Sequence, residues 1–209
     1  MRLTKYGHAC VRIEDDGRVL VIDPGVYSEP EALSGATAVL VTHEHEDHAD
    51  LEQLERAVLT NPALTVHGPA SWADSARDRL GNHVVGLSTG DAFSAAGFEV
   101  TAVGGKHAEI IDGLPDCANL GYVVDGGVYH PGDSYFVPTE PVQTLLVPAN
   151  GPWTKHREAI EFVRALGPSR MFPIHDIGLS ALGCANFDAW MGDEVADYAR
   201  IPVGSSVTF

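Results

Sequence analysis

Hydrophobic and polar residues alternate through the first part of the chain in a way that is typical of an antiparallel meander. Residues 3–6 and 10–14 switch between the two classes, as strands with one buried face do. Asp15-Asp16-Gly17 is a turn signal of the hairpin kind. The mostly apolar, β-branched run at 18–22 is typical of a central strand, and Asp23-Pro24-Gly25 ends it.

Beyond a loop at 26–36, short apolar runs alternate with helical stripes. The strand at 37–41 leads to a helix with Asp50 as its N-cap, in which Leu51, Leu54 and Val58 share one face. Further strands are predicted at 64–66, 84–85, 98–103, 120–124, 128–130, 144–147, 171–174 and 206–209. Further helices are predicted at 71–80 with Ser71 as cap, from Pro152 to 166, and at 188–199.

The strands and helices fall into two similar halves, each with strands followed by a helix. No long Gly, Ser or Pro linker separates the halves, and no period of 20–50 residues marks a repeat array. This order predicts two sheets packed face to face with helices outside. We therefore expect one α+β domain over residues 1–209.

Composition narrows the choice of partners. The net charge of −16 argues against a nucleic-acid or anionic membrane surface, because both require clustered basic residues. No apolar run approaches ~18 residues, and the N-terminus lacks the apolar core of a signal peptide. The three cysteines, widely spaced and odd in number, form no disulfide framework. We expect a cytoplasmic protein that acts on a small molecule, and the sequence leaves its oligomeric state open.

Histidines and carboxylates are concentrated between the strand at 37–41 and the following helix. Positions 43–48 read His-Glu-His-Glu-Asp-His, a set that is costly to gather without a compensating cation. His43 and His45, two apart on extended chain, point to one side, whereas the adjacent Asp47 and His48 cannot share one direction. This spacing suits two metal ions.

Polar residues also follow other apolar runs, and loops at strand ends commonly carry functional groups. We expect one ion on His43, His45 and His107 and a second on Asp47, His48 and His175, with the Asp133 carboxylate bridging them. Imidazole and carboxylate ligands favour zinc first, with manganese or iron possible.

These motifs resemble the metallo-β-lactamase-fold superfamily. The resemblance rests on His43-x-His45-x-Asp47-His48, on Asp23, on His107, on Asp133 in His-Pro-Gly-Asp, and on His175. It is strongest toward small metal-dependent hydrolases similar to ascorbate-6-phosphate lactonases and N-acyl-phosphatidylethanolamine phospholipase D. It implies a four-layer αββα sandwich, a dinuclear site between the sheets, and the same division of ligands.

Departures from other branches refine this expectation. True β-lactamases of this fold have a cysteine near the position of Asp133, so antibiotic hydrolysis is not expected here. Diiron oxygen-reducing relatives have glutamate where His45 stands, so His45 favours hydrolysis. RNA-processing relatives carry a basic arm that this chain lacks.

The expected reaction is hydrolysis of a small ester, lactone or phosphodiester by a metal-bridging hydroxide, which Asp47 would both ligate and orient. Asp23 is expected to hydrogen-bond His48. His8 is either a structural residue or a substrate contact and proton donor. The unassigned histidines read as structural or surface residues, and His156 is the best of them for lining the pocket; they are His67, His83, His130 and His156. Two alternatives stay open: an iron-dependent oxygenase on the same fold and a non-catalytic metal-binding sensor.

Overall fold

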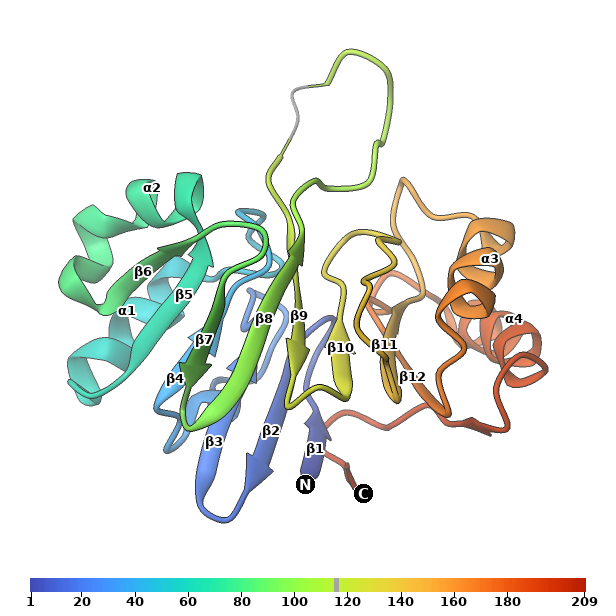
Figure 1. Cartoon of the computed structure of the whole chain (residues 1–209), viewed down its shortest axis with the longest axis horizontal. Helices are drawn as coiled ribbons and strands as arrows, with labels where there is room; N and C mark the ends of the chain where they lie inside the picture. The colour runs from blue at the N-terminus through green and yellow to red at the C-terminus, as the bar shows by residue number, and fades with distance from the viewer. Residues whose placement is uncertain (115–116) are drawn as a thin grey trace.

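Two seven-stranded sheets lie face to face in the computed structural model, which describes residues 1–114 and 117–209 (Figure 1). In spatial order, the first sheet consists of β14 (Ser206–Thr208), β1 (Arg2–Lys5), β2 (Val11–Asp15), β3 (Arg18–Ile22), β4 (Ala38–Leu40), β5 (Thr65–Pro69) and β6 (Val84–Leu87). The second consists of β13 (Asp197–Tyr198), β12 (Arg170–Ile174), β11 (Thr144–Pro148), β10 (Val128–His130), β9 (Leu120–Val124), β8 (Phe98–Gly104) and β7 (Ala92–Ala95).

Helices cover the outer faces of both sheets, so the molecule has four layers (Figure 1). α1 (Leu51–Thr60) and α2 (Ala70–Leu80) pack on the first sheet, and α3 (His156–Leu166) and α4 (Ala181–Gly192) pack on the second. Single 3₁₀ turns lie at Pro30–Leu33 and Gly81–His83. The αββα sandwich predicted from the sequence is confirmed. Within the described ranges, no helix has the length and apolar character to cross a membrane.

A central core fills the space between the two sheets. Leu3 and Ile13 of the first sheet meet Phe98 and Tyr122 of the second, and all four side chains are fully buried. Two outer cores lie between each sheet and its helices. Burial at about 25 cal/mol per Å² of apolar surface makes these three cores the main favourable contribution to folding.

Strand direction explains where functional residues gather. The meander β1–β2–β3 is antiparallel, as predicted, but β3 to β6 run parallel, and so do β10, β11 and β12. The carboxyl ends of these parallel strands lie along one edge of the sandwich. Side chains in the loops after β3, β4, β10 and β12 are therefore brought to a common region.

Several predicted boundaries were wrong. The last helix is α4 at Ala181–Gly192 rather than 188–199, because its residues are apolar on every side and give no amphipathic stripe, while Ser180 caps it by accepting a bond from the Gly183 amide. Ser71 is not a cap, since α2 begins at Ala70. Pro152 lies in a turn, and α3 begins only at His156. The strand predicted at 64–66 extends to Pro69, and the short strands β7 and β13 were missed.

His67 on β5 makes stability depend on pH. Burial lowers its pKa to about 4, and its ring stacks on Phe93 at 5.0 Å between centroids. Its unfolded-state pKa is near 6.5. As pH falls from about 6.5 to 4, the unfolded chain binds a proton that folded His67 does not, so stability falls. This proton linkage lowers the free energy of unfolding by on the order of 3 kcal/mol over that range, and we expect His67→Gln to abolish the effect. Urea denaturation of the wild type and of His67→Gln at pH 7 and pH 4.5 measures how much unfolding free energy each protein loses between the two pH values. Equal losses in the two proteins would contradict this role of His67.

Candidate metal centre

Eight polar side chains converge at the edge where the parallel strands end. Seven lie in loops that follow β4, β8, β10 and β12, and one lies in the β1–β2 turn. They are His8, His43, His45, Asp47, His48, His107, Asp133 and His175, and all seven metal ligands expected from the sequence are among them. Their roles as ligands remain a prediction, but their proximity is a feature of the structure.

The first group is His43, His45 and His107, whose candidate ligand nitrogens all lie within 4.8 Å of one another. The His43 Nε2 and His45 Nδ1 atoms are 3.0 Å apart. His107 donates from Nδ1 to the Ala108 carbonyl at 2.6 Å, so its buried Nε2 carries a lone pair. Burial, followed by neighbouring imidazoles, lowers the pKa of His43 and of His45. Neutral imidazoles with converging lone pairs are the form that binds metal.

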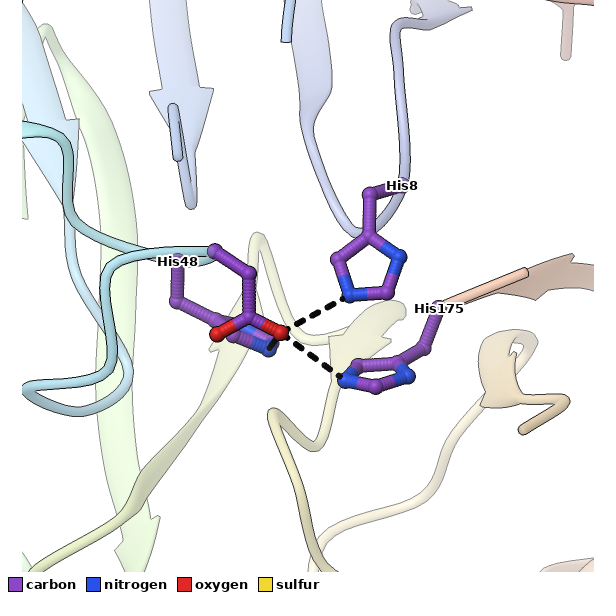
Figure 2. Close-up of side chains that lie close together, drawn as sticks. His8, His48 and His175 are labelled. Atoms are coloured by element: carbon purple, nitrogen blue, oxygen red, sulfur yellow. Dashed lines mark hydrogen bonds and ion pairs between the residues drawn. The ribbon is translucent and has the colours of Figure 1, made fainter. Parts of the chain in front are cut away.

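The second group is His8, Asp47, His48 and His175. His8 Nε2 lies 3.1 Å and His175 Nε2 3.6 Å from the same Asp47 carboxylate oxygen. Figure 2 shows the His8 and His175 rings joined by dashed lines to one carboxylate oxygen that lies between them. The His8 and His175 rings are 3.9 Å apart between centroids. Reasoning from the sequence gave His8 no partner, because chain spacing carries no sign of a contact between residues 8 and 47.

Asp133 lies between the two groups. One of its oxygens is 3.2 Å from His48 Nε2, and the other is 3.1 Å from His175 Nε2 and 3.4 Å from His107 Nε2. The indole N–H of Trp153 donates to the second oxygen at 3.2 Å. Burial alone raises the pKa of Asp133, but the surrounding histidines outweigh it and hold that pKa well below its usual range. This carboxylate therefore stays ionised and occupies the position expected of a bridge.

The site calls for positive charge. Burial opposes protonation of His48, yet the Asp133 and Asp23 carboxylates raise its pKa well above the usual range. Several buried atoms among the described residues also make no hydrogen bond: His8 Nδ1, His48 Nε2, His107 Nε2, Asp133 Oδ1, and both ring nitrogens of His175. Buried polar atoms without partners are rare unless a ligand satisfies them. The donor set therefore fits divalent cations, with zinc-type imidazole and carboxylate ligation.

Asp23 fixes the orientation of the cluster from behind. It is fully buried, and its two oxygens accept bonds from the Thr42 amide at 2.8 Å, the Thr42 hydroxyl at 2.7 Å and His48 Nδ1 at 2.7 Å. The contact between Asp23 and His48 expected from the sequence is present. Because Nδ1 donates to a carboxylate, Nε2 of His48 is free to act as a ligand.

Asp23→Asn is expected to weaken metal binding by about 10- to 100-fold, because the amide cannot accept all three bonds and hold the same His48 tautomer. Competition with a chromogenic chelator measures the apparent Kd. The exposed Asp78→Asn on α2 serves as the matched control. An unchanged Kd in Asp23→Asn would show that Asp23 only caps the turn.

The backbone is strained at the site. His8, Asp23 and His175 adopt φ values of +59°, +53° and +55°, which side chains other than glycine rarely do. Close packing accompanies this strain, since a Cβ on Gly25 would lie 1.9 Å from the Asp47 carbonyl oxygen. Glycine is thus required where the loop after β3 supports the loop that carries Asp47.

The buried ammonium group of Lys5 holds the strained residues His8 and His175 in place. Lys5 donates to the His8 carbonyl at 2.6 Å and to Asp176 at 3.3 Å, and the His175 amide donates to the same His8 carbonyl at 3.1 Å. Asp176 in turn pairs with Arg200. Sequence reasoning missed Lys5, because a lone lysine in a first strand gives no signal of burial.

The remaining histidines lie outside the cluster. His156 packs against Phe187 at 5.7 Å between ring centroids and lines neither cavity beside the cluster. His130 is buried and contacts the Ala9 carbonyl, and His83 contacts the Leu64 carbonyl. Together with His67, these histidines are structural, as expected.

Known proteins resemble this chain in sequence. A family profile described as "Beta-lactamase superfamily domain" matches residues 2–175. The chain belongs to the β-lactamase superfamily. Protein Rv0786c of Mycobacterium tuberculosis is 34% identical, and the match covers 100% of both chains. A UPF0173 metal-dependent hydrolase of Methanopyrus kandleri is 30% identical over 84% of each chain. The superfamily member described here therefore falls among the metal-dependent hydrolases.

Solved structures share the superfamily fold. Igni18, a metallo hydrolase from Ignicoccus hospitalis, superimposes with a TM-score of 0.75 at 22% identity, covering 100% of this chain and 97% of that one. CmlA, a diiron β-hydroxylase from Streptomyces venezuelae, gives 0.75 at 18% identity, covering 100% and 54%. At these identities the likeness concerns the fold alone.

Proposed function

We propose that this protein is a dinuclear metal-dependent hydrolase of a small ester, lactone or phosphodiester. The observation that carries the proposal is the pair of ligand groups joined by the buried Asp133 carboxylate. His43, His45 and His107 would hold one ion, and Asp47, His48 and His175 the other. When bound, two such ions would polarise the scissile bond and lower the pKa of a bound water. Zinc is the first candidate for this donor set.

The protein's own groups would then orient the reactants and move the proton. Asp47 accepts from His8 at 3.1 Å, so the carboxylate holds the His8 ring toward the second ligand group. We assign His8 the transfer of a proton to the leaving oxygen and Asp47 the orientation of the attacking water. Lys5 keeps the His8 main chain in its left-handed conformation.

The second candidate is an iron-dependent oxygenase, which the fold shared with CmlA brings into consideration. His45 counts against the oxygenase, because diiron oxygen-reducing relatives of this fold have glutamate at the position of His45. A hydrolase and an oxygenase differ in whether dioxygen is consumed, so one assay separates them.

The test is turnover by metal-analysed protein of a panel of lactones, thioesters and bis(p-nitrophenyl) phosphate, with oxygen consumption followed in parallel. We expect hydrolysis of at least one substrate class without oxygen uptake, lost in Asp47→Ala and retained in the control His83→Gln. Oxygen uptake by protein that contains stoichiometric iron would favour the oxygenase over the hydrolase as the function. Metal binding with no turnover of any kind would instead favour a non-catalytic metal-binding sensor.

A further inference from the structure

A cavity of about 260 Å³ opens directly beside His45 and His107. Its outer wall carries Ile110, Ile111 and Leu114, which are 41%, 62% and 54% exposed. Apolar side chains left open to solvent together at the mouth of a site mark a surface that binds apolar groups. A volume of about 260 Å³ lies below the range of about 300–1,000 Å³ that is usual for small-molecule sites, so the cavity suits a short chain.

The apolar wall is tied to the site at its base. Residues 105–114, which follow β8 and carry this wall, project beyond the end of the strand (Figure 1). The His107 amide donates to the Cys117 carbonyl at 2.9 Å, and the Ala108 amide donates to the Asp133 carbonyl at 2.8 Å. The three apolar residues are therefore held at a defined place relative to the candidate ligands His107 and Asp133.

Apart from the candidate ligands, the charged side chains that line the cavity are acidic. Glu44 and Glu109 line it, and no lysine or arginine does so among the described residues. A neighbouring cleft of about 500 Å³ contains Lys106 and Lys155, but Glu109 and Glu158 share it, and Lys155 pairs with Glu158 at 2.7 Å. A phosphodiester in the apolar cavity would bring its negative charge beside two carboxylates, on a chain with a net charge of −16.

We propose that the substrate is an uncharged carboxylic ester or lactone whose short alkyl chain lies against Ile110, Ile111 and Leu114. This rests on the proposed hydrolase function and narrows its substrate class. In the reaction the oxygen of water forms a bond to the acyl carbon, and the acyl C–O bond breaks. The leaving alkoxide takes a proton and departs as an alcohol or, in a lactone, remains attached as a hydroxyl.

The test compares kcat/KM of the metal-loaded full chain on p-nitrophenyl acetate, butyrate and hexanoate and on bis(p-nitrophenyl) phosphate. We expect an increase of up to about fourfold for each methylene added, which is the gain for a fully buried group. The phosphodiester should be the poorest substrate. A faster phosphodiester, or a rate independent of chain length, would overturn the substrate class while leaving the hydrolase function intact.

The double variant Ile110→Ser/Leu114→Ser is expected to reduce the hexanoate-to-acetate ratio of kcat/KM by about tenfold, because it removes apolar contact with the longer chain. Both side chains are exposed, so the fold does not depend on them. Leu182→Ser on α4, another exposed leucine at 71%, is the matched control and should keep the wild-type ratio. An unaltered ratio in the double variant would refute the proposed chain site. Failure of all four probes with wild-type protein would instead count against both the substrate class and the hydrolase function.

Discussion

Asp133→Asn is expected to lower kcat/KM by at least about 100-fold. Losses of this size follow the removal of a group that orients metal ligands or stabilises charge in the transition state. The substitution keeps the size of the side chain but removes the negative charge that faces His48, His107 and His175. An amide also places N–H donors against ring nitrogens that would bind metal, so it opposes ligation as well as failing to bridge.

Steady-state rates on the best substrate of the panel measure this effect, with Asp78→Asn as the control. Circular dichroism establishes that both variants fold. Loss of activity in Asp133→Asn alone supports the bridging position. Wild-type rates in a folded Asp133→Asn protein would contradict it, because no other carboxylate among the described residues contacts both groups.

Lys5→Met is expected to have the second-largest effect, although Lys5 lies behind the site. The ammonium group is buried and donates to the Tyr6 carbonyl, the His8 carbonyl and Asp176. Charged hydrogen bonds of this kind contribute about 1.5–3 kcal/mol each. Among the described residues, removing the donor leaves the His8 carbonyl with the His175 amide as its one remaining partner, so both strained histidines lose the support of Lys5.

We expect Lys5→Met to destabilise the fold by roughly 3 kcal/mol and to lower kcat about tenfold or more, with a smaller change in KM. Urea denaturation and steady-state kinetics give the two numbers. The exposed Lys155→Met is the control, since that lysine pairs with Glu158 at the surface. A destabilised variant that keeps its full kcat would make Lys5 a structural residue without a positioning role.

The general architecture was readable from hydrophobic periodicity. Alternating strands, a β-branched run at 18–22 and amphipathic helices at 51–60 and 156–166 each carry their own local signal. Helix α4 was misplaced because its burial depends on packing against α3 and β13, and an apolar residue on every side of a helix leaves no stripe to detect.

The site also has features that the sequence predicted and features that it did not. His43 to His48 and the residues after later strands were predicted, because ligand-type side chains directly follow apolar runs and match the motifs that the chain shares with the superfamily. The contact between His8 and Asp47 and the burial of Lys5 were not, because both depend on how the β1–β2 turn packs against loops distant in sequence. Left-handed backbone at His8 and His175 is likewise imposed by that packing and has no local signature.

The number of metal ions per chain tests the dinuclear centre most directly. Inductively coupled plasma mass spectrometry on protein purified without chelators and then dialysed gives the ratio of metal to protein. We expect two divalent ions per chain in the wild type and fewer in Asp133→Asn. One ion or none in a wild-type protein that is fully active would contradict the two-metal centre.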